Sequence, residues 1–186
     1  MGSQTSTGSP ARYGTVAIVL HWVLGAAIVG AFCFGLYLED MPRSLAKLQF
    51  MNWHKWAGIC ILLASVGRLL WRVTHRPPDL PDAIARAMPG WQHLAHRATH
   101  GLLYAMFLLV PLAGWAYSSA RGYPVVLFGL WPLPDLVGKN PEMAEWLEEA
   151  HAIGAFALMG LVGLHVLGVV KHQLIDRDGL LKRMLP

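Results

Sequence analysis

Four long apolar stretches constrain this chain more than any other feature of its sequence. Each is rich in Leu, Val, Ala and Gly, and each is close to the ~20 residues that a helix needs to cross a hydrocarbon core of ~30 Å. None shows the alternation of polar and apolar residues that a β-barrel requires. Only 14% of the 186 residues are charged, whereas a soluble domain carries about 25%. The sequence therefore predicts an all-α membrane protein, with spans over Thr15–Leu38, Asn52–Val73, Thr99–Ser118 and Glu149–Lys171.

The spans are predicted to form one domain over residues 15–173, a four-transmembrane-helix bundle with up-down-up-down order. Residues 1–14 are polar and rich in Gly, Ser and Thr, which predicts a disordered N-terminal tail, and residues 174–186 form a basic cytoplasmic tail. Two connecting stretches predict surface helices of their own. They are AIARAMPGWQHLAH before the third span and PEMAEWLEE before the fourth.

Lys and Arg are distributed unevenly between the two sides of the predicted bundle. The connection after the second span and the C-terminal tail are rich in them, whereas the connection before the fourth span carries Glu142, Glu145, Glu148 and Glu149. Because short cytoplasmic loops carry an excess of Lys and Arg, both termini are predicted to be cytoplasmic. The net charge of +4 follows from this topology, so the expected partner is the lipid bilayer and not nucleic acid.

The fourth span contains two histidines, His151 and His165, in an otherwise apolar run. Ionisable residues inside a span are costly and mark functional sites, although a single buried histidine often serves only an interhelical hydrogen bond. Fourteen residues at about 100° each bring both side chains to one helix face, and a rise of about 1.5 Å per residue separates them by about 21 Å. One metal ion cannot use both, but two sites stacked at different depths can.

Each of these two histidines needs a partner at the same depth on another helix. Near the outer boundary the available residue is His54, at the start of the second span, so it is paired with His151. Towards the inner boundary His21 matches the depth of His165, and His100 competes for that place. The sequence therefore predicts two pairs that each join two helices, one near each membrane surface.

A glycine one turn along the same face follows each of four histidines in the spans. Glycine lacks a Cβ atom, so it leaves room for a flat macrocycle beside an imidazole. His100 has Leu103 and Tyr104 at the corresponding positions and does not fit the pattern. His21 is therefore preferred as the partner of His165. The glycines are Gly25 after His21, Gly58 after His54, Gly154 after His151 and Gly168 after His165.

Two b-type haems, each held by two histidines, fit this set of ligands best. Non-covalent haem needs no CxxCH motif, and the sequence contains none. The two cysteines, Cys33 and Cys60, lie in apolar spans and are too few for a Cys-ligated zinc or iron–sulfur site. With both axial positions filled, the iron favours outer-sphere electron transfer over oxygen activation. The predicted iron ligands are His21, His54, His151 and His165.

Three further polar residues are expected near the inner pair. Arg68 follows His54 by fourteen residues and shares its face; its guanidinium either pairs with haem propionates or extends to the cytoplasmic interface. His96 lies four residues before His100, which is near the start of the third span, so the two share one helix face. Each of them either touches a propionate or a quinone or has a plain capping or interface role.

Several motifs together resemble the bacterial di-haem cytochrome b561 family over nearly the whole chain. They are RYGTVAIVLHW in the first span, WHKWAG and GRLLWR in the second, HGLLYAMFLLVPLAGW in the third, GLHVLG in the fourth and the tail KHQLIDRDGLLKRMLP. The resemblance implies a four-helix protein of the bacterial inner membrane, with two haem b groups on the His21–His165 and His54–His151 pairs. It also implies superoxide:ubiquinone oxidoreductase activity, in which superoxide is oxidised at the periplasmic face and membrane ubiquinone is reduced.

Two other functions remain open from the sequence. The same ligand layout occurs in the cytochrome b subunits of hydrogenases and formate dehydrogenases. The chain is therefore alternatively an anchor subunit that passes electrons between a partner dehydrogenase, reductase or periplasmic protein and quinone. Its short loops, which leave little docking surface, argue against this. A transporter of protons or divalent metal ions would use acidic residues inside the spans, and only Glu149, at the edge of one, is present.

Overall fold

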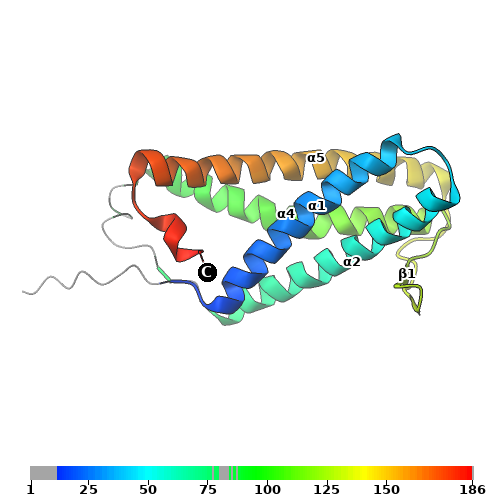
Figure 1. The fold of residues 1–186 in the computed structure, drawn as a ribbon, viewed down its shortest axis with the longest axis horizontal. Helices are drawn as coiled ribbons and strands as arrows, with labels where there is room; N and C mark the ends of the chain where they lie inside the picture. The colour runs from blue at the N-terminus through cyan, green and yellow to red at the C-terminus, as the bar shows by residue number, and fades with distance from the viewer. Residues whose placement is uncertain (1–11, 77, 80–83, 85, 87, 186) are drawn as a thin grey trace, which may run out of the picture.

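A computed structural model describes residues 12–76, 78–79, 84, 86 and 88–185. Within this part of the chain, four helices are long and apolar enough to cross a membrane, which confirms the predicted all-α fold. They run alternately in opposite directions along one bundle (Figure 1). The helices are α1 (Thr15–Asp40), α2 (Leu45–Thr74), α4 (Gly90–Ala120) and α5 (Pro141–Lys171). Residues 1–11 of the predicted disordered tail lie outside the described residues.

The two ends of the bundle differ in what they carry. The end that holds both chain termini is called here the terminal end (Figure 1). The other, the hairpin end, holds the strands β1 (Val126–Leu127) and β2 (Trp131–Pro132), which pair antiparallel. The indole Nε1 of Trp56 donates a hydrogen bond to the carbonyl oxygen of Val126 at 2.7 Å, and this bond holds the hairpin against α2.

Three of the helices begin earlier than the predicted spans. Ser44 caps α2 by accepting a hydrogen bond from the backbone of Lys47 at 3.1 Å, so the helix starts seven residues before the expected Asn52. Asn140 caps α5 in the same way, and Pro141 occupies its first turn, where a missing N–H costs nothing. The prediction of a separate PEMAEWLEE helix is therefore wrong, because this segment forms the first turns of α5.

The other predicted surface helix is also only partly separate. The segment GWQHLAH belongs to α4, which starts at Gly90 and continues without a break into the third span. Several residues of the preceding AIARAM segment lie outside the described residues. A long α4 matters for the site because its first turns carry His96 and His100 at the terminal end.

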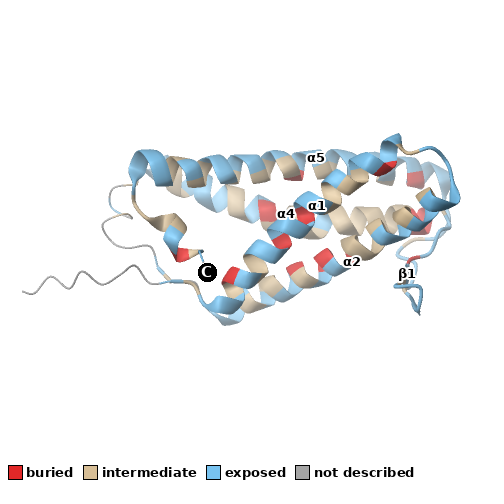
Figure 2. Cartoon of the chain, in the orientation of Figure 1, coloured by how far each residue is buried: buried red, intermediate tan, exposed pale blue. Residues whose placement is uncertain are grey.

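The buried core lies at the middle of the bundle and receives side chains from all four helices. Outside it, most apolar side chains are exposed, as expected of a surface that faces lipid (Figure 2). Leu158 lies seven residues after His151 and seven before His165, so the core lies between the two predicted cofactor depths. The core residues are Leu24, Ile28, Ile61, Leu103 and Leu158.

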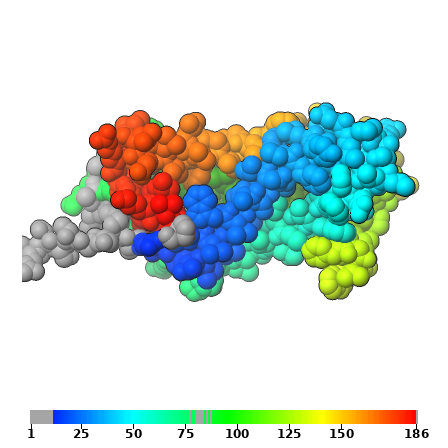
Figure 3. Space-filling view, viewed as in Figure 1, coloured from blue at the N-terminus to red at the C-terminus, as the bar shows by residue number. Residues whose placement is uncertain are grey.

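The C-terminal segment folds back onto the bundle after α5. It passes through a π-helical turn (His172–Asp176) and a 3-10 turn (Leu180–Arg183), and it then packs against the start of α1 (Figure 3). Arg183 is buried, at 3% exposure, and its guanidinium donates to the carbonyl oxygens of Pro78 at 2.8 Å and Asp79 at 2.9 Å. The indole of Trp22 donates to the carbonyl oxygen of Met184 at 2.7 Å.

Candidate cofactor sites in the two halves of the bundle

The half of the bundle near the hairpin end contains the first predicted pair of histidines. His54 projects from α2 and His151 from α5, and their ring centres are 6.2 Å apart with the planes at 87°. These two residues were predicted from the sequence to form a pair, because no other histidine in a span lies at this depth. We call this pair, with its surroundings, the hairpin-half site.

The separation of the two rings matches the distance at which two imidazoles bind one metal ion from opposite sides. A metal–nitrogen bond of about 2 Å, with each nitrogen about 1 Å from its ring centre, places such ring centres about 6 Å apart. The observed 6.2 Å therefore fits a single iron between His54 and His151. Among the described residues no carboxylate forms an ion pair or hydrogen bond with either ring, so the donor set is purely imidazole, as bis-histidine haem requires.

Helix α4 supports His151 although it contributes no predicted ligand here. The Nδ1 atom of His151 lies 2.9 Å from the carbonyl oxygen of Val110, and a carbonyl can only accept. Gly114, one turn further along α4, faces the same ring, because a Cβ atom there would lie 2.9 Å from Cε1 of His151. Helix α4 thus gives His151 both a hydrogen-bond acceptor and the space that its ring occupies.

The surroundings of His54 also suit a cofactor. Its Nδ1 atom is buried and has no hydrogen-bond partner among the described residues, which is costly for a polar atom unless something else satisfies it. A Cβ atom at Gly35 of α1 would lie 3.4 Å from its Cε1. A cavity of about 70 Å³ lies beside both rings; apart from the two histidines its lining is apolar, and it includes Gly58, Phe32, Phe107, Pro111 and Met159.

The half near the terminal end contains the second predicted pair. His21 of α1 and His165 of α5 have ring centres 6.1 Å apart with the planes at 73°, almost the same separation as in the first pair. This geometry also fits one iron between two imidazoles. We call this pair, with its surroundings, the terminal-half site. The indole of Trp22 lies edge-on to His21, with ring centres 5.3 Å apart.

His100, the competitor that the glycine pattern disfavoured, lies close to the same place. Its ring centre is 5.2 Å from that of His165 and 4.2 Å from that of His96. Its Nδ1 atom lies 2.9 Å from the carbonyl oxygen of His96 and is therefore the donor in that bond. The structure thus gathers His21, His96, His100 and His165 into one cluster, in which His165 has two neighbouring rings.

Arg68 reaches into this cluster. Its Nη2 atom lies 3.0 Å from Nδ1 of His21, and since a guanidinium only donates, Nδ1 is the acceptor. The guanidiniums of Arg68 and Arg72 also lie over the ring of Tyr104, at 5.7 and 5.4 Å from its centre. An arginine held between a histidine and an aromatic ring is directed inward, so Arg68 does not extend to the interface in this structure.

The four glycines that the sequence analysis singled out differ in their surroundings. No atom of the described residues lies within 4 Å of a Cβ atom built at Gly25, Gly58 or Gly168, so space is open beside them. At Gly154 the Cβ atom would lie 3.1 Å from a methyl group of Val110. Gly154 therefore allows α4 and α5 to approach each other, which is a packing role rather than clearance for a ligand.

Sequence reasoning missed the residues that reach these sites from neighbouring helices. The close contacts of Gly35 with His54 and of Gly114 with His151 come from other helices, whereas the i+3 and i+4 pattern relates a histidine only to glycines of its own helix. Trp22 and Tyr104 were likewise missed, because aromatic residues near span ends are usually interface anchors. The only sequence signal for Gly114 is its place one turn after Pro111 inside a span.

Four apolar helices that bring histidines together in pairs between them define a class of helical membrane protein whose cofactors lie inside the bundle. Residues 12–186 match the family model described as prokaryotic cytochrome b561. The chain therefore belongs to the prokaryotic cytochrome b561 family, whose members carry out membrane electron transfer and contain b-type haem. The resemblance seen in the sequence motifs is confirmed.

Individual relatives are similar over almost their whole length. The chain is 30% identical over 187 residues to cytochrome b561 homolog 2 of Escherichia coli (strain K12), covering 96% of this chain and 94% of the relative. It is 26% identical over 175 residues to a protein of Yersinia pestis named probable superoxide oxidase CybB, covering 94% and 96%. It is 27% identical over 176 residues to cytochrome b561 homolog 1 of Escherichia coli (strain K12), covering 94% and 97%.

Proposed function

We propose that the chain passes single electrons across the bacterial inner membrane between two b haems. His54 and His151 would hold one in the hairpin-half site, and His21 and His165 the other in the terminal-half site. The observation that carries this proposal is the pair of near-equal ring separations, 6.2 and 6.1 Å, at two depths of one bundle. When bound, a b haem with two axial imidazoles supplies a one-electron couple and leaves no open iron position.

The residues of the hairpin-half site are arranged to present a metal-binding nitrogen. A neutral imidazole carries one proton, and the bond from Nδ1 of His151 to the Val110 carbonyl fixes that proton at Nδ1. The Nε2 lone pair of His151 is then free for iron. Such a hydrogen bond also raises the basicity of the ligand nitrogen, which strengthens ligation.

The terminal-half site needs one rearrangement to bind iron. Arg68 donates to Nδ1 of His21, so a neutral His21 carries its proton at Nε2. Ligation through Nε2 requires that this proton move to Nδ1 and that Arg68 leave it. The guanidinium would then pair with a haem propionate, because its two parallel N–H donors match the two oxygens of a carboxylate. His100, beside His165, is the residue next in reach of the same propionates.

Superoxide is the donor that we propose for the hairpin end, with ubiquinone as the acceptor. Two superoxide anions would each lose one electron to give dioxygen, and one ubiquinone would take up two electrons and two protons. The similarity to the probable superoxide oxidase of Yersinia pestis supports this reaction. Lys55, which follows His54 in the sequence, supports it too, because its ammonium lies at the hairpin end, 3.2 Å from the carbonyl oxygen of Tyr123, and would attract an anion. The hairpin end is then periplasmic and both termini are cytoplasmic, as the distribution of Lys and Arg indicates.

Two measurements test the proposal. A pyridine haemochrome assay on the purified protein is expected to give two b haems per chain, and a ratio of one or none would contradict the pairing. Stopped-flow mixing of the oxidised protein with superoxide is then expected to produce the absorption spectrum of reduced b haem. With superoxide dismutase present, the reduction is expected to disappear.

One observation favours a second candidate, an anchor subunit with a protein donor. The hairpin and the residues that lead into it expose large apolar side chains at the proposed donor side: Tyr123 at 66%, Phe128 at 50%, Leu130 at 70% and Trp131 at 59%. Such a patch suits a partner protein. If superoxide leaves the protein oxidised while two haems are present, the anchor function replaces the superoxide reaction. Replacing Phe128 and Trp131 with Ser would then impair quinone reduction in cells without changing the number of haems per chain.

A further inference from the structure

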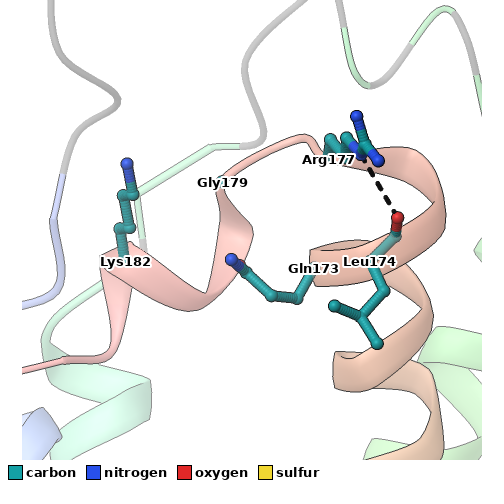
Figure 4. Close-up of a pocket in the computed structure, with 5 residues that line it drawn as sticks. All are labelled: Gln173, Leu174, Arg177, Gly179 and Lys182. Carbon is teal, nitrogen blue, oxygen red and sulfur yellow. Dashed lines mark hydrogen bonds between the residues drawn. The ribbon is translucent and has the colours of Figure 1, made fainter.

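A cavity separate from both histidine sites lies at the terminal end, where α5 ends and the C-terminal segment begins. It has a volume of about 300 Å³ and lies between the π-helical turn His172–Asp176 and the 3-10 turn Leu180–Arg183. Figure 4 shows its side chains. They are Gln173, Leu174, Arg177, Gly179 and Lys182.

The polar lining of this cavity is suited to an anion. Arg177 and Lys182 each bring a positive charge, the amide of Gln173 can donate, and none of the five lining residues is acidic. The nearest acids are engaged elsewhere. Asp176 is 2.5 Å from the ammonium of Lys171, and Asp178 is 2.6 Å from Nδ1 of His172. Within the described part of the chain, neither Arg177 nor Lys182 forms an ion pair.

The backbone turns sharply so that the two charges border the same space. Arg177 has φ +52° and Gly179 φ +72°, both in the left-handed region, and the chain reverses there between the π turn and the 3-10 turn. Asp178 fixes this reversal, since its Oδ1 accepts from the backbone N–H of Leu180 at 3.1 Å. Lys182 comes from the 3-10 turn, whereas Gln173 of the π turn and Arg177, which directly follows that turn, lie on the other side of the cavity (Figure 4).

An apolar track leads from the cavity along the part of α5 that crosses the membrane. The predicted fourth span ends at Lys171, and the helical stretch that contains it ends at Asp176, so the cavity lies at the expected membrane surface. Leu167, Val170 and Leu174 recur at helical spacing on one face and are 66%, 43% and 65% exposed. Leu174 belongs both to this track and to the cavity lining.

We propose that this cavity binds the phosphate of an anionic phospholipid, with an acyl chain along Leu174, Val170 and Leu167. The phosphate is the chemistry that two cations and an amide donor recognise, and a basic pocket at the end of a membrane span is where lipid headgroups are found. The adjoining apolar track favours a lipid over free phosphate, which would use only the polar part. This proposal does not depend on the haem ligands or on the electron donor.

Native mass spectrometry of the full-length, haem-loaded protein tests the proposal. The protein in neutral detergent is titrated with phosphatidylglycerol, with phosphatidylcholine or with inorganic phosphate. We expect a bound phosphatidylglycerol that phosphatidylcholine does not replace. The double variant Arg177→Gln/Lys182→Gln should bind it about 25-fold more weakly, since each cation near a lipid surface contributes a factor of roughly five.

A matched variant separates a site from general charge attraction. Arg43→Gln/Lys139→Gln removes two exposed cations at the hairpin end and should leave phosphatidylglycerol binding unchanged. Equal losses in the two double variants would overturn the proposal. If millimolar inorganic phosphate displaced phosphatidylglycerol from the protein, the cavity would be a site for small anions, and the lipid assignment would be overturned. If the first double variant fails to fold, Gln173→Glu places a carboxylate in the cavity with both cations retained, and it should also weaken binding.

Discussion

The Nδ1 atom of His151 on α5 lies 2.9 Å from the carbonyl oxygen of Val110 on α4. This bond connects a predicted iron ligand to a helix that supplies no ligand in that half of the bundle. It fixes which nitrogen of His151 carries the proton, and the neighbouring Gly114 leaves the room that the ring needs. The hairpin-half site is therefore shaped by three helices although only two carry its histidines.

Gly114→Ala is expected to damage the hairpin-half site alone. The new methyl group would lie 2.9 Å from Cε1 and 3.0 Å from Nδ1 of His151, so the ring has to move from the Val110 carbonyl. Loss of such a supporting contact typically lowers cofactor affinity about 10–100-fold. Haemochrome titration during haem reconstitution measures this. Gly160→Ala is the matched control, because no described atom lies within 4 Å of its added Cβ atom.

His54→Ala and His151→Ala should each lower the haem content from the proposed two per chain to one, and the same haem should be lost in both. The two residues share one site with ring centres 6.2 Å apart, so either change leaves a single imidazole. Low-temperature absorption and electron paramagnetic resonance spectra distinguish the two haems. Loss of different haems in the two variants would show that the pairing is wrong.

His21→Ala and His100→Ala decide which residue completes the terminal-half site with His165. Both rings lie near that of His165, at 6.1 Å for His21 and 5.2 Å for His100. Only the first separation fits an intervening iron, and Nδ1 of His100 is already a donor to the His96 carbonyl. We expect His21→Ala to lose the terminal-half haem and His100→Ala to retain it. The reverse result would make His100 the ligand.

Arg68→Gln should lower the midpoint potential of the terminal-half haem. A cation near the iron favours the reduced state, and removing one at this range changes the potential by roughly 50–100 mV. A potentiometric titration followed at the α-band measures the shift. Arg68→Lys keeps the charge and should shift the potential much less, and the potential of the other haem should not change in either variant.

Arg183→Met should release the C-terminal segment from the bundle. The guanidinium of this buried residue donates to the carbonyl oxygens of Pro78 and Asp79, and charged hydrogen bonds of this kind contribute about 1.5–3 kcal/mol. Faster digestion of the segment by carboxypeptidase measures the release, with Lys139→Met as an exposed control. Unchanged digestion would mean that the remaining contacts, such as that of Trp22 with the Met184 carbonyl, hold the segment alone.

The sequence predicts much of this fold because both of its strongest signals act along single helices. Apolar length defines the spans, and a spacing of fourteen residues places His151 and His165 on one face at two depths. The starts of α2, α4 and α5 were not predicted, since polar first turns such as Pro141–Glu149 do not have the composition of a span, and this stretch was predicted to be a separate surface helix. Contacts between helices were also missed. The hydrogen bond to Val110 and the approach of Gly114 depend on how α4 is rotated against α5, which no periodicity within one helix determines.

The return of the C-terminal segment to α1 sets an order on assembly during synthesis. Trp22 donates to the carbonyl oxygen of Met184, and Tyr13 donates from its backbone to that of Arg183 at 3.2 Å. The first helix to leave the ribosome therefore completes its contacts only after residues 183 and 184 have emerged, when all four helices have been translated. Because His21 adjoins Trp22, the terminal-half site reaches its final form last, whereas the hairpin-half site depends on no residue of this segment.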